Sequence, residues 1–259
     1  MQKLVRYEIA GGVARIVLDH PQTRNALSDA MLDDLIEAFT HAKTDPEARV
    51  VVLTSSHRSV FSAGGDLKNF ASDSNAIAKY ANLDRYPRLC TLIGGLGKPV
   101  LCAANGHVLA GSLGLALSCD LVVAKESVRF GCPEINVGLF PFMVSALLGR
   151  NIGRLKANEL MMLGDAITAS QAADIGLVNK VVVDEEFEEA VDDWAARLAS
   201  KSPLLMKLGK DAINSTRDAT LAEALEMLRA QLALALTTED VLEGVAAFQE
   251  KRDPRWTMS

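Results

Sequence analysis

The chain has 259 residues, of which 49% are hydrophobic and 23% charged, and its formal net charge is −6. This composition predicts a folded chain with a large buried core, organised as one α/β domain or as one domain with a helical appendage. The acidic balance argues against broad nucleic-acid binding, which needs a basic face, so we expect no nucleic-acid partner.

The cysteines and the apolar segments bear on compartment and membrane contact. Cys90, Cys102, Cys119 and Cys132 show no spacing typical of a metal site, so we expect reduced structural thiols, no metal and a cytoplasmic location. The first residues alternate like a strand and lack the apolar core of a signal peptide. Glycine, serine and aspartate interrupt the most apolar run, residues 108–124, which predicts a buried helix passing into a strand and no membrane partner.

The N-terminal part of the chain reads as strands around one amphipathic helix. Strands are predicted over residues 4–9 and 13–18, and the glycine pair between them is typical of a hairpin. Ser28 is suited to cap a helix that runs to about residue 43. The β-branched run at residues 50–54 predicts a strand that is buried on both faces.

The middle of the chain continues the mixed pattern. The segment FSAGGDL at residues 61–67 predicts a glycine turn that leads towards a helix, and residues 89–96 carry an apolar helical stripe. A strand is predicted over residues 99–104. A helix opens near residue 110, and two strands follow it and end at residues 131–134.

The last part of the chain is mostly helical. Helices are predicted at residues 155–163, 169–175, 187–200, 203–215, 220–237 and 239–252, with one strand at 178–183. The chain therefore divides into an α/β core at residues 1–195 and a C-terminal helical region at residues 196–259.

The start of the helix near residue 110 is crowded with small residues, and it indicates a site for an anion. Ala110, Gly111, Ser112 and Gly114 would leave the first backbone N–H groups of this helix open to a ligand. Such donors stabilise a carbonyl oxygen on which negative charge develops. Glu134 follows one strand pair later. We therefore predict a pair of backbone donors with one acid or base facing them.

Short motifs run in a fixed order along nearly the whole chain, and together they resemble the crotonase family, also called the enoyl-CoA hydratase/isomerase superfamily. The resemblance implies a spiral of ββα units with a C-terminal helical region for trimerisation and active-site cover, assembled as homotrimers or hexamers. The matching pieces are Arg24-Asn25-Ala26-Leu27, Phe61-Ser62-Ala63-Gly64-Gly65-Asp66-Leu67, Lys98-Pro99, Asn105-Gly106, Ala110-Gly111, Cys119-Asp120, Phe130-Gly131, Pro133-Glu134, Gly138, Gly244, Phe248, Lys251, Arg252 and Pro254.

The resemblance implies an acyl-CoA thioester as substrate and assigns its oxyanion donors. In the family, two backbone N–H groups hold the thioester oxygen, and here they belong to Gly65 and Gly111. Losing one such donor typically costs roughly 2.7–4 kcal/mol of transition-state stabilisation. The alternative is that both glycines only permit tight turns, and the family context favours the catalytic role.

Glu134 matches the catalytic glutamate of the family. The alternative is a solvated carboxylate at a strand end. The apolar residues on both sides indicate instead a wall of the acyl site, where burial would raise the pKa of the carboxyl group, as a proton shuttle needs. We therefore expect Glu134 to act as the acid and base.

The sequence departs from the hydratases of the family at Gly114. Hydratases carry a second glutamate there, three residues after the oxyanion glycine, and use two carboxylates to hold water. With Gly114 this pair is broken, whereas one base suffices to move a proton from C2 to C4 of a 3-enoyl thioester. We expect a Δ3/Δ2-enoyl-CoA isomerase. The alternatives are a hydratase with a single glutamate and a non-catalytic acyl-CoA-binding scaffold.

Further residues are expected near the substrate, and no cofactor is expected beyond the coenzyme A that the substrate carries. Asp66 follows the Gly65 donor and is counted with the substrate contacts, although a structural helix cap is the simpler interpretation. His107 either faces the acyl pocket or is a core or surface residue, and the second is the simpler interpretation. Asp120 is expected to cap the end of the central helix. Phe140, with Phe142 and Met143, forms either the acyl pocket or plain core. The candidates for CoA phosphates are Arg24, Lys68, Lys251 and Arg252. The full set of predicted substrate contacts is Ala26, Ala63, Gly64, Asp66, Leu67, Phe140 and Lys251.

Overall fold

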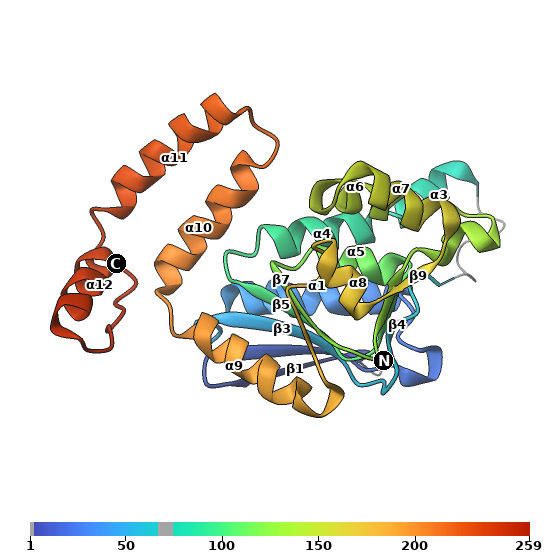
Figure 1. Cartoon of the computed structure of the whole chain (residues 1–259), viewed down its shortest axis with the longest axis horizontal. Coiled ribbons are helices and arrows are strands. Elements are labelled where there is room, and N and C mark those ends of the chain that lie inside the picture. The colour runs from blue at the N-terminus through green and yellow to red at the C-terminus, as the bar shows by residue number, and fades with distance from the viewer. Residues whose placement is uncertain (1–2, 67–74) are drawn as a thin grey trace.

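The computed structural model describes residues 3–66 and 75–259, and it contains a body of sheets and helices from which three helices project (Figure 1). The main sheet has six strands in the order β1-β2-β3-β5-β7-β10. β1 and β2 are antiparallel, and every other neighbouring pair is parallel. The strands are β1 (Val5–Ala10), β2 (Val13–Leu18), β3 (Val50–Ser55), β5 (Val100–Ala104), β7 (Leu121–Lys125) and β10 (Lys180–Val182).

A second sheet of four strands, ordered β4-β6-β8-β9, positions the site described below. β4 and β6 are parallel, as are β6 and β8, so the segments that follow these strands leave the sheet at one edge. β9 is antiparallel to β8. The strands are β4 (Val60–Ser62), β6 (His107–Leu109), β8 (Arg129–Gly131) and β9 (Ala166–Thr168).

The helices of the body begin and end largely where the sequence predicts. Ser28 caps α1 by accepting a hydrogen bond from Met31 N at 3.3 Å, and the capping box of Thr168 and Gln171 opens α8. α3, α6 and the three 3-10 helices were not predicted. The elements are η1 (Pro21–Thr23), α1 (Asp29–Thr44), α3 (Ala76–Asn82), α4 (Arg85–Gly94), α5 (Gly111–Leu117), η2 (Pro133–Val137), α6 (Phe142–Asn151), α7 (Arg154–Leu163), α8 (Ala169–Asp174), η3 (Asp184–Glu186) and α9 (Phe187–Ala199).

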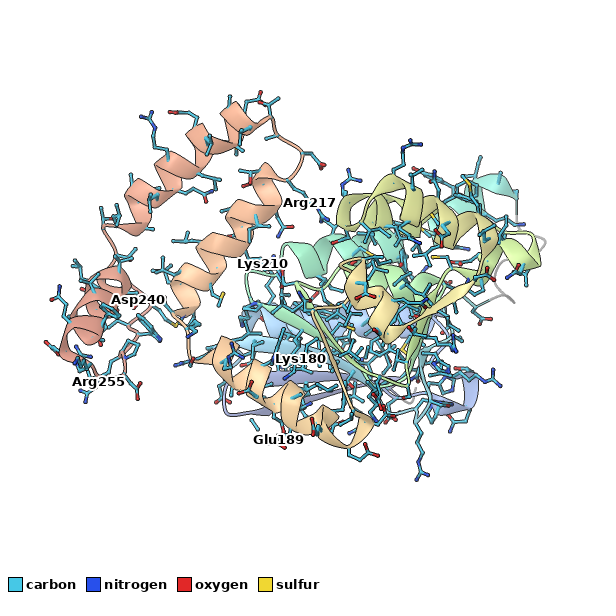
Figure 2. The ribbon with its side chains drawn as sticks, viewed as in Figure 1. Lys180, Glu189, Lys210, Arg217, Asp240 and Arg255 are labelled. Carbon is cyan, nitrogen blue, oxygen red and sulfur yellow. The ribbon has the colours of Figure 1, made fainter. Side chains whose placement is uncertain are left out.

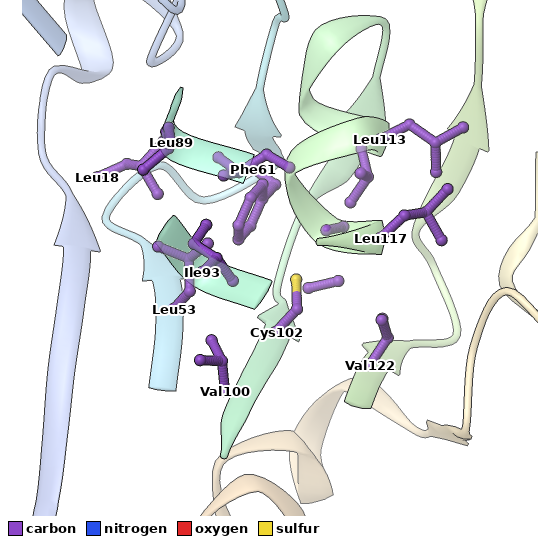
Figure 3. Packing of buried hydrophobic residues seen from close by; sticks show 14 of the residues in the cluster. Leu18, Leu53, Phe61, Leu89, Ile93, Val100, Cys102, Leu113, Leu117 and Val122 are labelled. Atoms are coloured by element: carbon purple, nitrogen blue, oxygen red, sulfur yellow. The ribbon is translucent and has the colours of Figure 1, made fainter. Parts of the chain in front are cut away.

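Two hydrophobic clusters cover the two faces of the main sheet. Because side chains alternate along a strand, Val51 and Leu53 of β3 join the larger cluster, while Val50 and Val52 join the smaller one. Figure 3 shows how the larger cluster is built from side chains of β3, β5, α4 and α5. The smaller cluster packs against α9, within which the predicted domain boundary after residue 195 falls.

The three projecting helices form an arm: α10 (Pro203–Thr216), α11 (Leu221–Ala235) and α12 (Glu239–Glu250) (Figure 1). A buried lysine joins the arm to the body, because Lys210 Nζ lies 2.7 Å from Asp120 Oδ2 and 3.0 Å from Lys98 O. Figure 2 shows Lys210 on the side of α10 that faces the body. The same Asp120 oxygen accepts a hydrogen bond from Val100 N at 2.7 Å. The predicted helix cap at Asp120 is therefore wrong, and this carboxylate ties β5 to the arm.

No helix in the described residues is both long and apolar enough to cross a membrane. Within residues 3–66 and 75–259, no group of three or more histidine, cysteine or acidic side chains is arranged to hold a metal ion.

Candidate active site

Two glycine-containing segments meet at the edge of the smaller sheet. The first follows β4 and carries Gly65, which pairs with Leu27 in a parallel bridge. Leu27 N donates to Gly64 O at 2.8 Å, and Ala63 N donates to Arg24 O at 2.9 Å. These bonds hold the glycine segment against residues 24–27, so the two motifs of the sequence form one loop pair.

A buried asparagine holds this loop pair to the main sheet. Asn25 is fully buried, and its Nδ2 donates to Ser55 Oγ at 2.7 Å and to Phe61 O at 3.2 Å. Its Oδ1 accepts from His20 N at 2.7 Å. Since a buried amide is costly unless it is hydrogen-bonded, these three bonds fix the loop in one place.

The second segment follows β6 and ends in Gly111, the first residue of α5. A Cβ atom placed on Gly111 would lie 3.5 Å from Gly65 N, so the two glycines face one space. The N–H of a first helical residue has no partner inside its helix. Among the backbone hydrogen bonds that turns, loops and helix caps make in the described residues, none has the N–H of Gly65 or of Gly111 as its donor. The structure therefore brings together the two amides that the sequence singled out.

The close approach of the two segments requires glycine at position 64. Gly64 has φ +82°, and a Cβ there would lie 2.5 Å from Ala110 Cβ and 3.0 Å from Gly111 N. Ala110 itself has φ 56°, a region that residues with a Cβ rarely adopt. The backbone around the two amides is thus held in an unusual conformation by its surroundings.

Two buried serines bridge the segments. Ser112 Oγ lies 2.9 Å from Ser62 O and 2.7 Å from Leu109 O, so the two carbonyls share its one proton. Ser62 Oγ donates to Asn25 O at 2.7 Å and accepts from Gly64 N at 3.2 Å. Neither serine was predicted to have a role, although small polar residues beside glycines in an apolar stretch are a signal for such bridges.

Glu134 lies in η2, directly after β8, so the smaller sheet also delivers the carboxylate. Its Oε2 is buried and has no hydrogen-bond partner among the described residues. Burial raises the pKa of Glu134, and a backbone hydrogen bond offsets part of that rise. Burial, with a contribution from the Glu134 charge, also raises the pKa of Cys132 to about 12, so this thiol stays protonated.

Tyr86 of α4 is a residue of the site that sequence analysis missed. Its hydroxyl group donates to Gly111 O at 2.6 Å, and only 7% of the residue is exposed. Burial raises the pKa of Tyr86 well above its ordinary value, and Cys90 and Glu134 raise it further. Tyr86 lies one turn before Leu89, outside the apolar stripe that the sequence predicts at residues 89–96, so the pattern did not mark it.

The sequence pattern of the family described as Enoyl-CoA hydratase/isomerase matches residues 8–259. The chain belongs to this family.

Relatives and solved structures of the family cover almost the whole chain. The 2,3-dehydroadipyl-CoA hydratase of Escherichia coli (strain K12) is 36% identical over 243 residues, which are 93% of this chain and 94% of that protein. A probable mitochondrial enoyl-CoA hydratase 2 of Arabidopsis thaliana is 37% identical over 95% of this chain and 82% of its own length. The crystal structure of an enoyl-CoA hydratase from Mycobacterium smegmatis has a TM-score of 0.94 at 32% identity and covers 98% of this chain and 99% of that one.

The expected family and fold class are thus confirmed. The protein is an acyl-CoA-processing enzyme of the enoyl-CoA hydratase/isomerase family with the crotonase fold. The sequence motifs were decisive because they occur in family order, whereas any one of them alone is short.

The predicted substrate contacts divide into those near the two amides and those elsewhere. Ala26, Ala63 and Gly64 lie in the loop pair that carries Gly65. Asp66 follows directly, while Leu67 and Lys68 lie outside the described residues. His107 Nδ1 accepts from Arg129 N at 3.2 Å, so this histidine joins β6 to β8.

Phe140 follows η2 and packs against the core, and its ring lies 5.3 Å from that of Phe142. Phe142 is 76% exposed and Met143 39% exposed. Of the two alternatives for this group, plain core is therefore wrong for Phe142 and Met143. Phe142 and Met143 instead form an exposed apolar surface that follows the segment carrying Glu134 in the chain.

Two predicted cation contacts lie far from the amides within one chain. Lys251 directly follows α12, which lies at the far end of the arm from α5 (Figure 1). Arg252, its neighbour, is paired with Glu243 at 2.6 Å and with Glu250 at 2.6 Å. Neither residue joins Gly65 and Gly111 in the same subunit.

Proposed function

We propose that this enzyme is a Δ3/Δ2-enoyl-CoA isomerase in which Glu134 is the single proton shuttle. The observation that supports this most directly is the Glu134 carboxylate itself, with one buried oxygen that lacks a partner in the described structure. A carboxylate that is desolvated in this way is a stronger base than one in water, so it can take up a proton and, as the acid, return it.

The proposed reaction keeps every atom of the substrate. The Glu134 carboxylate takes a proton from C2 of a 3-enoyl thioester, and the electron pair moves onto the thioester oxygen to give a dienolate. The N–H groups of Gly65 and Gly111 hold this oxygen. The Glu134 carboxylic acid then gives the proton to C4, and the double bond comes to rest between C2 and C3. The carboxylate is thereby regenerated.

Hydration is the second candidate, because the named relatives are hydratases. It requires a water molecule to be activated at C3 of a 2-enoyl thioester by Glu134 alone. Gly114 supplies no second carboxylate, so we rank hydration below isomerisation.

The substrate and the assembly belong to the same proposal. An acyl-CoA thioester would place its acyl chain beside Phe140 and its thioester oxygen between the two amides, with no cofactor beyond its own coenzyme A. We propose that three arms meet in a homotrimer, or in a hexamer of two trimers, which would bring Lys251 of one subunit to the CoA of another. The cytoplasmic location stays a prediction.

The experiment that tests the function compares two substrates with three proteins. Wild type, Glu134→Gln and Glu189→Gln are incubated with 3-enoyl-CoA and with 2-enoyl-CoA, and products are identified by mass and retention time. We expect the wild type and Glu189→Gln, an exposed control on α9 (Figure 2), to convert the 3-enoyl ester at unchanged mass. Glu134→Gln should be slower by about 10²-fold or more, since it cannot accept the proton.

A product heavier by one water from the 2-enoyl ester would replace isomerisation with hydration. Turnover by Glu134→Gln at the wild-type rate would remove Glu134 from the mechanism. Binding of both esters without turnover would favour the scaffold alternative.

A further inference from the structure

The place where a second glutamate would stand in a hydratase is occupied in this chain. A Cβ atom built on Gly114 would lie less than 3.0 Å from Tyr86 Oη, a separation that real side chains do not show. The same Cβ would lie 3.2 Å from Leu147 Cδ1 and 3.3 Å from Val144 Cγ2 of α6. The Tyr86 hydroxyl group therefore fills the position that the missing side chain leaves.

This hydroxyl group is bonded to the residue that carries one oxyanion donor. Tyr86 Oη donates to Gly111 O at 2.6 Å, and a Cβ on Gly111 would lie 3.7 Å from Tyr86 Cε2. The hydroxyl group of Tyr86 thus bonds the Gly111 carbonyl, and the edge of the Tyr86 ring lies beside the Gly111 Cα. It stays protonated, because burial raises the pKa of Tyr86 well above its ordinary value.

The backbone at Gly111 needs contacts from neighbouring elements, because the preceding residue is in a disfavoured conformation. Gly111 follows Ala110, whose φ of 56° is disfavoured for a residue with a Cβ. A strained residue persists only where its surroundings over-determine it. The Ser112 bonds fix one end of this turn, and the Tyr86 bond fixes the Gly111 carbonyl.

We propose that Tyr86 is a positioning residue that fills the space of a side chain at position 114 and, by holding the Gly111 carbonyl, fixes the residue whose N–H faces the thioester oxygen. This inference rests on the proposed role of Gly111 as an oxyanion donor. It explains why the site has no cavity at position 114, although the second carboxylate of the water-holding pair is absent. It also implies a substrate class that needs proton transfer at carbon rather than water addition.

The first test removes the hydroxyl group and keeps the ring. Tyr86→Phe should lower kcat on 3-enoyl-CoA about tenfold with KM within about twofold, since the Gly111 donor counts most when charge develops. Tyr7→Phe is the matched control, because Tyr7 also donates one hydrogen bond, to Asp45 Oδ2 at 2.8 Å, but from β1. Tyr7→Phe should keep the wild-type kcat.

A spectroscopic readout separates positioning from a merely structural role. The thioester carbonyl of 13C-labelled butyryl-CoA, which cannot isomerise, is followed by isotope-edited infrared spectroscopy. Its stretch should move to lower frequency on binding to the wild type and to Tyr7→Phe, and move less on binding to Tyr86→Phe. If Tyr86→Phe loses thermal stability but gives the wild-type carbonyl frequency, the role of Tyr86 is only structural and the proposal is overturned.

A double-mutant cycle tests the contact between Tyr86 and Gly114. Gly114→Ala should lower kcat at least as much as Tyr86→Phe, because the added methyl group must push the hydroxyl group off Gly111. The double variant Tyr86→Phe with Gly114→Ala should be no slower than Gly114→Ala alone. Multiplied losses in the double variant would contradict the shared position.

The outcomes separate this proposal from the proposed function. If the wild type does not isomerise 3-enoyl-CoA, the function fails, and the infrared comparison with butyryl-CoA still decides on Tyr86. If the wild type isomerises and Tyr86→Phe equals it in kcat and carbonyl frequency, only the Tyr86 proposal fails. If butyryl-CoA does not bind to the wild type, both fail.

Discussion

Position 64 shows how a single side-chain atom would disturb the site. The segment after β4 and the turn before α5 approach so closely there that a methyl group has no room, and the backbone has the positive φ that glycine tolerates. The AGG motif is therefore a steric requirement for placing Gly65 and Gly111 side by side, whatever the chemistry that follows.

We expect Gly64→Ala to lower kcat by about 10²- to 10³-fold, the typical effect of losing one oxyanion donor, because Ala110 and Gly111 must move away. Gly11→Ala is the control, since Gly11 also has a positive φ of 58° but nothing within 4 Å of its added Cβ. Steady-state kinetics and thermal melts of both variants check this. Equal losses of activity in the two would show that strain alone matters.

Residues predicted from the sequence are those that short motifs mark. Gly65, Gly111 and Glu134 could be placed from the motifs, although their roles stay a proposal. Tyr86 could not be placed, because its role depends on how α4 packs under α5, and no local pattern encodes that packing. The broken pair at Gly114 was visible, but the group that fills its place was not.

At the scale of elements, local signals located most helices. The helices predicted at residues 155–163, 169–175 and 220–237 are confirmed as α7, α8 and α11; Gly164 follows the first, and capping boxes at Thr168 and Thr220 open the other two. α3 and η2 were missed because they are short and make no periodic apolar stripe. The prediction that Asp120 caps a helix was wrong because its partner Lys210 lies 90 residues away in the sequence.

The base of the arm depends on that long-range pair. Lys210→Met should lower the free energy of unfolding by about 1–3 kcal/mol, less than for a fully buried pair because Asp120 is 34% exposed. Lys207→Met, on the same helix, removes the exposed pair with Asp211 and should change it by about 0.5 kcal/mol or less. Denaturant unfolding at equal protein concentration measures both. Equal effects would mean that the Lys210 pair adds no stability.

At the scale of the whole molecule, the arm is built like an interface. α11 is fully described and has no buried residue, although it is largely apolar. A surface of this kind exceeds what single exposed hydrophobic residues explain and is typical of association. Exposed apolar residues of the arm include Ile213, Leu221, Leu225, Leu232, Leu234, Leu236, Leu242, Val245 and Phe248.

We expect the wild type to sediment as a trimer or hexamer, and Leu232→Glu to shift it towards the monomer, because a charge would be buried between copies. Glu189→Lys on α9, an exposed change outside the arm, should leave the mass unchanged. Analytical ultracentrifugation decides this. A wild type that is monomeric at micromolar concentration would refute the assembly.

The unpartnered carboxylate of Glu134 also links the stability of the whole chain to pH. Its pKa is higher in the folded chain than the ordinary value near 4.3. At pH values between these two pKa values, the folded state therefore binds more protons than the unfolded state. Folding free energy from this group is therefore most favourable below pH about 4.3 and is lost as the pH rises through the folded pKa. Above its folded pKa the ionised group opposes folding, so the Glu134→Gln protein should be more stable there than the wild type. Under the proposed mechanism, the carboxylate that moves the proton is therefore also one that costs folding free energy.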